Sequence, residues 1–347
     1  MDKNKLNKFI IILFPAGIIF FILFLYFFAG IDNVISTILS MDPLYYLSAL
    51  FFTVLSMFVY SLTWWYLLRV FSTGIPYRKT FQYTWVANFI DILIPAETVS
   101  GDIARTYLAT KSLNGKAGEV VASIIAHKIL SVIIPLPCLV ISLVEVMLEI
   151  SLPPLFLNFV ILTTIGTTVT LAFLILISVN GKAAENVLNK LFDLLGRVLG
   201  KRLNIDSLKS KVQTFLNSFS HAMQVLSKSP TIIIFASGLA LIAWILDLLA
   251  YYLVFIAIGV KISPAAVVMV YSIISTVQLI PFGSPGWVGP MEIIMTGLFI
   301  PFGLSISVSA AATILIRLVT LWFKFLIGGI MVQWTGLEFI LKKSEKQ

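Results

Sequence analysis

Charged side chains are scarce in this sequence. Lys, Arg, Asp and Glu together make up 12% of its 347 residues, whereas a soluble domain carries about 25%. Hydrophobic residues account for 59%, and the mean hydropathy is +1.02. This composition excludes an ordinary soluble globular domain and predicts an all-α polytopic membrane protein.

Cysteine and histidine are nearly absent. A single cysteine, Cys138, excludes a disulfide within the chain. Two histidines far apart in the sequence cannot build a His-rich metal site, and no Gly-Lys-Ser/Thr phosphate loop is present. We therefore predict no cofactor, no metal and no enzyme activity.

Acidic residues are fewer than basic ones, with 16 Asp and Glu against 24 Lys and Arg and a net charge of +8. In a soluble protein this excess would suggest a nucleic-acid partner. In a membrane protein it is explained by the positive-inside bias and by attraction to anionic lipids. We expect no nucleic acid among the partners.

Long apolar runs, by contrast, are plentiful. About 20 residues cross the hydrocarbon core, and runs of this size predict about six full transmembrane helices. They lie near residues 9–29, 44–68, 118–149, 155–179, 230–258 and 304–334. The first run follows MDKNKLNK and is too long for a signal peptide, so we expect it to be retained.

Two pairs of shorter apolar segments do not fit this pattern. Residues 80–95 and 97–112 form one pair, and residues 265–281 and 286–300 form the other. Each segment has about 15–17 residues, at or below the lower limit for spanning. Broken helices at membrane depth need protein or a water-filled cavity around them. We predict two re-entrant helical hairpins, with full spans as the alternative.

Basic residues define the orientation. Three precede the first span, three follow the second, three precede the third, eight lie in 180–229 and three end the chain, which is 20 of 24 on one side. The loops 30–42 and 145–154 carry none. The positive-inside rule therefore predicts that both termini are cytoplasmic. We expect the protein to lie in the cell (plasma) membrane.

An internal repeat accompanies this topology. The tripeptide LIP at 93–95 recurs at 279–281, and flanking segments match at similar offsets. We interpret 1–347 as a single membrane domain, with one repeat at about 44–149 and a second, inverted repeat at about 230–334. Inverted repeats with broken helices are a transporter architecture. Chance similarity between apolar helices is the alternative.

Residues 180–229 form a polar insert. Apolar residues recur there at helical spacing between lysines and arginines. This pattern predicts either amphipathic helices on an anionic lipid surface at the cytoplasmic face or a solvated linker that packs on the bundle.

Ionisable residues in the hairpins and the helices that follow them are the candidate binding site. A charge at the bilayer centre costs at least about 2.5 kcal/mol, so it faces a partner or a cavity. A helix N-terminus beside an arginine suits phosphate. The candidates are the cations Arg105, Lys128 and Arg317 and the acids Glu97, Asp102 and Glu292. The alternative is a set of ion pairs that fix helix register.

Local patterns give finer expectations. The residues expected to break the hairpin helices are Pro95, Gly101, Pro281, Pro285 and Gly289. Ser100 is predicted to cap a helix that starts at Gly101, with Asp102 and Arg105 paired at i, i+3. Asp91 and His127 are open candidates, and Asp247 suits a buried polar contact or a proton-coupling acid. Trp64 and Tyr251 are expected in interfacial belts.

These motifs resemble a known family. PAETVSGDIARTYL is similar to the first signature of the lysylphosphatidylglycerol synthase transmembrane region, a flippase-like family, through Pro95, Gly101, Asp102 and Arg105. The second signature, a glycine-rich turn followed by Gly-x-x-Glu, and a later arginine are matched as well. Those matches are Pro281, Pro285, Gly286, Gly289, Glu292 and Arg317. At His127-Lys128 the family often has Glu-Arg, so the acid is lost and one cation is kept.

The resemblance implies lipid translocation without synthase activity, because the soluble aminoacyl-transferase domain is lacking. The expected substrate is a membrane phospholipid or a polyprenyl-phosphate lipid. Two alternatives stay open. One is an integral-membrane enzyme of lipid-linked phosphate or glycan chemistry, and the other is a non-transporting subunit of a glycosyltransferase or synthase.

Overall fold

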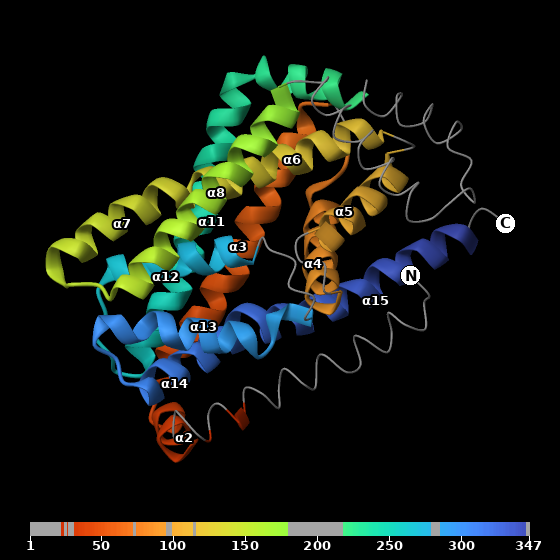
Figure 1. The fold of residues 1–347 in the computed structure, drawn as a ribbon. Helices are drawn as coiled ribbons and strands as arrows, with labels where there is room; N and C mark the ends of the chain where they lie inside the picture. Colours follow the sequence, from red (N-terminus) through yellow and green to blue (C-terminus); the bar gives the residue numbers. More distant parts are fainter. Residues whose placement is uncertain are drawn as a thin grey trace, which may run out of the picture.

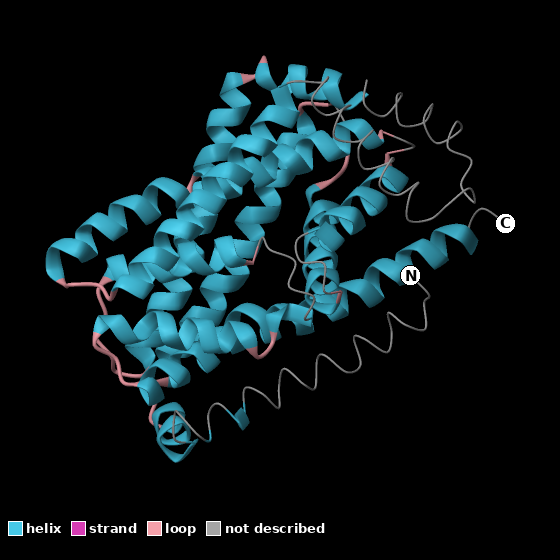
Figure 2. Ribbon diagram, viewed as in Figure 1, coloured by secondary structure: helices cyan, strands magenta, loops and turns pink. Residues whose placement is uncertain are grey.

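The computed structural model describes residues 22–23, 26, 31–71, 74–94, 99–113, 116–179, 218–278 and 285–344. Within these ranges the regular structure is helical throughout, with short loops between helices (Figure 2). The prediction of an all-α fold is confirmed for this part of the chain.

Five helical segments of the described chain are long and apolar enough to cross a membrane. They are Pro43–Arg69, Ala117–Glu149, Pro154–Leu176, Pro230–Ala257 and Ile306–Gly336. These segments coincide with five of the six predicted spans, whereas the run 9–29 lies outside the described residues. The chain is therefore a multi-pass membrane protein.

Proline fixes the start of several helices. It occupies the first turn of α3 (Pro43–Arg69), α7 (Pro135–Glu149), α11 (Pro230–Ala257), α12 (Pro264–Val277) and α13 (Pro290–Phe299). A proline lacks an N–H, which costs nothing in a first turn, where that group has no partner within the helix. At α3 the Asp42 carboxylate also accepts the Leu44 amide at 2.8 Å. The positions of these prolines, with the Asp42 cap at α3, therefore determine where the helices begin.

Two of the long spans are interrupted. Pro135 separates α6 (Ala117–Ile133) from α7, since it cannot donate to the preceding turn. A π-helical turn, η5 (Leu318–Trp322), separates α14 (Ile306–Arg317) from α15 (Phe323–Ser344). π-Turns inside α-helices are frequently found at functional sites. This one lies directly after the candidate residue Arg317.

The two predicted short pairs are present as short helices. The first pair is α4 (Tyr77–Leu93) and α5 (Val99–Ser112), and the second is α12 with α13, joined through the 3₁₀ turn η3 (Pro285–Trp287). At about 1.5 Å per residue, the 10 to 17 residues of each fall short of a hydrocarbon core of about 30 Å. Of the predicted breaks, Pro95 and Pro281 lie outside the described residues.

The turn η3 of the second pair lies against the last turn of α4 in the first pair. Gly286, in η3, has a positive φ of 56°, and a Cβ there would lie 3.2 Å from Ile92 Cγ2 in the last turn of α4. The same Cβ would lie 2.9 Å from Leu321 Cδ1 in η5. Glycine is required here because the backbone must both adopt a left-handed conformation and approach its neighbours closely.

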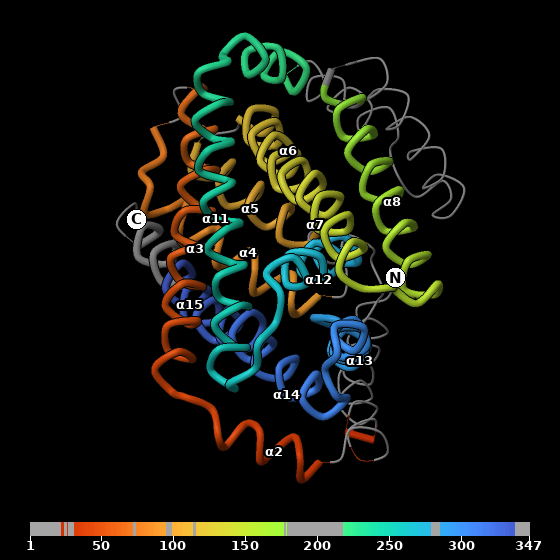
Figure 3. The backbone as a smooth tube through the Cα atoms, turned by 90° about the vertical axis from the view of Figure 1, so that its left-hand side faces the viewer, coloured from red at the N-terminus to blue at the C-terminus, as the bar shows by residue number. Residues whose placement is uncertain are grey.

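The order of elements in the second half of the chain repeats that of the first. The first half runs α3, α4, α5 and α6–α7, and the second runs α11, α12, α13 and α14–α15, with α8 (Pro154–Val179) between them. The long helices α3 and α11 lie side by side and run in opposite directions (Figures 1 and 3). Ser56 Oγ of α3 donates to the Ala243 carbonyl of α11 at 3.1 Å.

Candidate functional site

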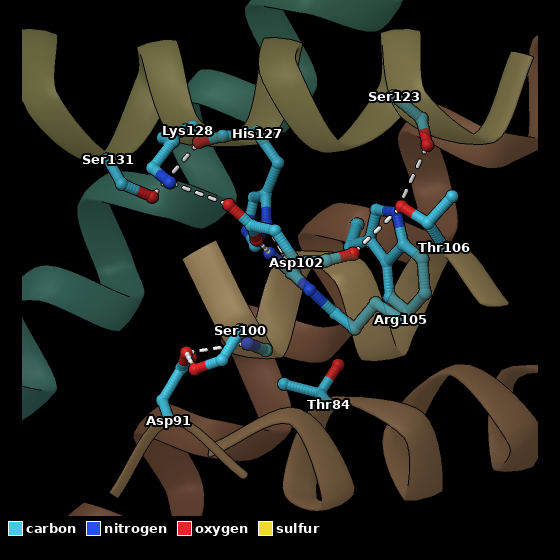
Figure 4. A network of polar contacts seen from close by, with 12 residues as sticks. Thr84, Asp91, Ser100, Asp102, Arg105, Thr106, Ser123, His127, Lys128 and Ser131 are labelled. Atoms are coloured by element: carbon cyan, nitrogen blue, oxygen red, sulfur yellow. Dashed lines mark hydrogen bonds and ion pairs between the residues drawn. The ribbon is translucent and has the colours of Figure 1, made fainter. Parts of the chain in front are cut away.

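The N-terminus of α5 is held by a carboxylate from α4. Asp91 Oδ1 accepts the Ser100 hydroxyl at 2.8 Å and the Gly101 amide at 2.6 Å (Figure 4). A carboxylate suits this place because the first amides of a helix have no partner in the helix and carry partial positive charge. The prediction that Ser100 caps the helix is wrong, since Ser100 is itself within α5 and donates to Asp91.

Gly101 has a different role from the predicted helix break. It lies in the first turn of α5, which begins at Val99. A Cβ at Gly101 would overlap the Asp91 carboxylate and would lie 2.7 Å from the Ala87 carbonyl oxygen. The glycine is therefore needed so that α5 can approach α4 closely enough for Asp91 to bind its amides.

We expect Gly101→Ala to destabilise the protein by about 1–3 kcal/mol, the usual cost of overpacking. The measurement is equilibrium unfolding in detergent, followed by circular dichroism. Gly238→Ala in α11 is the matched control, because a Cβ there meets nothing within 4 Å, and alanine is the better helix former. Equal stabilities for the two variants would show that the α4–α5 approach is loose.

Asp102 joins two cations of the first half of the chain. Its Oδ2 accepts Lys128 Nζ of α6 at 2.6 Å, and its Oδ1 pairs with Arg105 one turn along α5 (Figure 4). The predicted i, i+3 pair is confirmed. Arg105 is 5% exposed and lies 3.4 Å from His127 Nδ1 through its Nη1. This cluster thus carries one more cation than acid before His127 is considered.

The Trp64 ring packs against the Arg105 guanidinium. The guanidinium carbon lies 5.1 Å from the centroid of the Trp64 ring, and a cation in this position is attracted to the ring face. Trp64 is fully buried, and its Nε1 donates to Ser123 Oγ at 3.1 Å. The expectation that Trp64 belongs to an interfacial belt is wrong. Tyr251 is buried as well and is not a belt residue.

Glu292 and Arg317 form a buried pair in the second half of the chain. Arg317 Nε donates to Glu292 Oε1 at 2.7 Å, and both side chains are 5% exposed or less. Glu292 Oε2 accepts the Gly289 amide at 2.6 Å, while Arg317 Nη2 donates to the Gly286 carbonyl. Gly289, one of the predicted breaks, directly precedes Pro290 at the start of α13. The pair therefore also fastens the turn between η3 and α13.

That turn is conformationally demanding. Gly286, Trp287 and Gly289 all have positive φ, at 56°, 53° and 96°. A tryptophan in the left-handed region is strained, and such strain persists only where neighbouring contacts over-determine it. Here the contacts of Arg317 and Glu292 on either side of Trp287 supply that constraint.

A polar cavity lies between the two halves, and we call it the central cavity. It has two neighbouring lobes, of about 270 Å³ and about 190 Å³. Both lobes are lined by Asn88, Asp91, Asp247, Tyr271, Ser275, Gln278 and Lys324. The larger lobe adds Asp102, Arg105 and Lys128, and the smaller adds Gly286 and Arg317. Candidates from both halves of the sequence thus converge here.

The outcome for the predicted site residues is uneven. Arg105, Asp102, Lys128 and Arg317 line the central cavity. Glu292 does not line the cavity, and its carboxylate accepts a hydrogen bond from Arg317, which does. Glu97 lies outside the described residues. Pro285 is buried in η3, at the turn that approaches α4.

Lys324 and Asp247 also line this cavity, although neither was among the predicted lipid-binding residues. Lys324 Nζ lies 3.7 Å from Asp247 Oδ1, and the Tyr271 hydroxyl donates to Asp247 Oδ2 at 3.2 Å. The sequence carries one hint of Lys324, its place seven residues after Arg317 on the same apolar run. Asp247 makes the predicted polar contact, with Tyr271 and Lys324, and its side chain also lines the cavity.

The comparisons with known proteins agree with the motifs. The sequence pattern of the family described as lysylphosphatidylglycerol synthase TM region matches residues 12–328. A UPF0104 membrane protein of Methanothermobacter thermautotrophicus is 25% identical, over 88% of this chain and 89% of its own length. Relatives with the same description come from Pyrococcus horikoshii, 23% identical over 94% and 97%, and Methanocaldococcus jannaschii, 22% over 99% and 100%.

Proposed function

This chain belongs to the family of the lysylphosphatidylglycerol synthase transmembrane region, and we propose that it translocates a phosphate-containing lipid across the membrane. The headgroup binds in the central cavity, and the hydrocarbon tails stay in the bilayer. The lipid carries an anionic, aminoacylated or polyprenyl-linked phosphate. The protein transports this lipid without changing it chemically.

The observation that carries this proposal is the meeting of cations from both halves at one cavity. Among the described residues, Arg105, Lys128, Arg317 and Lys324 line it. Arginine forks and lysine ammonium groups are the usual protein ligands of phosphate. With lobes of about 270 and 190 Å³, the cavity has room for a hydrated headgroup but not for a whole lipid.

Asn88 adds a neutral group to the same surface. Its Oδ1 is buried and has no hydrogen-bond partner within the described part of the protein, and its side chain lines both lobes. Buried polar atoms are nearly always paired, so an unpaired one at a cavity suits a ligand or water. We propose that Asn88 contacts a hydroxyl or amine of the headgroup.

We further propose that the two halves are inverted units with re-entrant hairpins, which rock against each other to alternate access. Three features support this arrangement. The helices α3 and α11 run in opposite directions. Gly74 and Gly259 follow them with similar φ, 65° and 70°. The pairs Asp102–Lys128 and Glu292–Arg317 each join a short helix to the next long one, across 26 and 25 residues.

The remaining expectations complete this proposal. Both termini face the cytoplasm of a plasma-membrane protein, and the whole chain is one membrane domain. The predicted contact of the insert 180–229 with anionic lipid falls mainly on residues 180–217, which are outside the described part. In the described part of the insert, Phe219, Ala222 and Leu226 are buried against the bundle. A glycosyltransferase or synthase that makes or uses the lipid is the proposed partner.

Reconstituted vesicles test the function. We expect the protein to move a fluorescent phosphatidylglycerol or polyprenyl phosphate between leaflets, with no change in the mass of the lipid. Arg105→Ala should lower the rate about 10- to 100-fold, because a charge-assisted hydrogen bond is worth about 1.5–3 kcal/mol. The control is Lys261→Ala, which removes an exposed loop cation.

Each contrary outcome has a distinct meaning. An altered lipid mass would identify an enzyme. Equal rates in the wild type, Arg105→Ala and empty vesicles would reject transport of both probes.

A further inference from the structure

An apolar groove on the outside of the bundle adjoins the central cavity. It has a volume of about 710 Å³ and lies between α5, α6 and α8. Its apolar lining includes Ile103, Tyr107, Val121, Ile124, Ile125 and Leu174. Ile103 and Tyr107 are 65% and 63% exposed, so the groove is open toward the surroundings of the bundle.

The inner end of this groove is the ion pair of the cavity. Asp102 and Lys128 line both the apolar groove and the larger polar lobe. Their bond, at 2.6 Å, therefore lies between an apolar-lined space and a polar-lined one. Such a junction matches a lipid, whose apolar and polar parts are joined covalently and need adjacent sites of opposite character.

The length and ends of the groove also suit a lipid tail. Along α5 it extends from Val99 to Lys111, which is about 18 Å at 1.5 Å per residue. One leaflet contributes about 15 Å of hydrocarbon. At the far end, Lys111 Nζ lies 5.8 Å from the Tyr107 ring centroid. A lysine beside a tyrosine is typical of the membrane interface, where lipid phosphates lie.

We propose that this groove binds one hydrocarbon tail of the lipid in two successive positions. The phosphate first lies at Lys111, and it lies in the central cavity once the headgroup has passed the Asp102–Lys128 pair. The groove is then the lateral path from one leaflet to the central cavity. The occupant is a phosphate-bearing lipid of the leaflet at that level. This inference rests on the proposed function, because it assigns the access path for the same substrate.

Photolabelling tests the tail site directly. Wild-type protein is reconstituted in phosphatidylcholine vesicles that contain either a phosphatidylglycerol or a farnesyl phosphate with a diazirine in its tail. Labelled residues are then mapped by mass spectrometry. We expect labelling of α5 and α6 in the groove to fall when the unlabelled form of the same lipid is added. Labelling of the outer face of α7, which meets bulk lipid, should not fall.

A matched pair of substitutions sharpens the test. Ile103→Trp fills the groove, whereas Ile141→Trp adds the same bulk to α7 at an isoleucine of equal exposure, 64% against 65%. Ile103→Trp should lower the competable labelling about tenfold, since displacing two methylenes from apolar contact has that effect. Ile141→Trp should leave it unchanged.

The outcomes separate this inference from the proposed function. Groove labelling that neither lipid competes, or that Ile103→Trp leaves intact, overturns the tail site even where transport is observed. Competable groove labelling in a protein that transports neither probe supports the tail site and rejects translocation. If competition is seen with only one of the two lipids, the result supports the site and shows which of the two lipid classes it binds.

Discussion

Glu292→Ala is expected to destabilise the protein by about 3–5 kcal/mol, the usual cost of breaking a buried ion pair from one side. The change leaves the Arg317 guanidinium, which is 4% exposed, without its carboxylate. It also removes the acceptor of the Gly289 amide, which supports a turn with three positive φ angles. Equilibrium unfolding in mixed detergent micelles measures the effect.

Two further variants identify the cause. Glu149→Ala removes an exposed acid at the end of α7 and should change the unfolding free energy by less than about 0.5 kcal/mol. Glu292→Ala combined with Arg317→Met removes both charges and should regain part of the lost stability, because no uncompensated charge is then buried. A double variant no more stable than Glu292→Ala would mean that the turn, and not the charge, dominates.

Hydropathy is sufficient to predict the membrane class and the long spans. The alternation of long apolar runs with shorter Pro- and Gly-rich ones separates the spans from α4, α5, α12 and α13. This works because the bilayer imposes a minimum length on any spanning helix. The same reasoning cannot find the π-turn after Arg317, since the apolar run 304–334 continues through it without a break in composition.

The acid–base pairs of the site are partly predictable. The Asp102–Arg105 pair follows from helical spacing. The cost of an unpaired charge in a membrane predicts that Lys128, Arg317 and Glu292 each have a partner, but it does not say which. Asp91 is different, because its partners depend on how closely α4 and α5 approach each other, which is set by Gly101. A glycine in the sequence of a hairpin is compatible with a helix break and with a close contact between two helices, so the sequence alone does not tell which of them applies.

The positions of aromatic residues in the sequence do not predict which of them are buried. Trp64 lies beside Trp65 and Tyr66 near the end of an apolar run, which is the pattern of an interfacial belt. Burial of Trp64 against Arg105 arises from the packing of α3 against α5 and α6, and a linear pattern contains no information about it. Lys324 and Asp247 meet for a similar reason, through the packing of distant helices.

Lys324→Gln is expected to weaken phosphate-lipid binding and transport about 10- to 100-fold, at least as much as Arg105→Ala. Arg105, Lys128 and Arg317 already hold carboxylates at hydrogen-bonding distance. The Lys324 ammonium lies 3.7 Å from Asp247, beyond a hydrogen bond. A phosphate that binds Lys324 therefore displaces only the weak Lys324–Asp247 contact. Less of the free energy of phosphate binding is then lost than at a cation whose close carboxylate partner must be displaced.

The control distinguishes ligand binding from ion-pair stability. Lys324→Arg should keep most of the transport rate, and Lys228→Gln, at an exposed position, should keep all of it. Asp247→Asn is the decisive variant. If Lys324 binds phosphate, removing the competing carboxylate leaves lipid binding equal or tighter, measured as the lipid concentration at half-maximal transport.

If Lys324 and Asp247 serve only to pair with each other, either single change should give the same loss. The double variant would then lose no more than each single one, as in any cycle whose two sites share one interaction. Opposite signs for Lys324→Gln and Asp247→Asn would instead place the phosphate of the lipid between α11 and α15. In that position the headgroup contacts the second repeat through Lys324 and the first through Arg105 across one cavity, which is the contact that a rocking motion of the two halves needs.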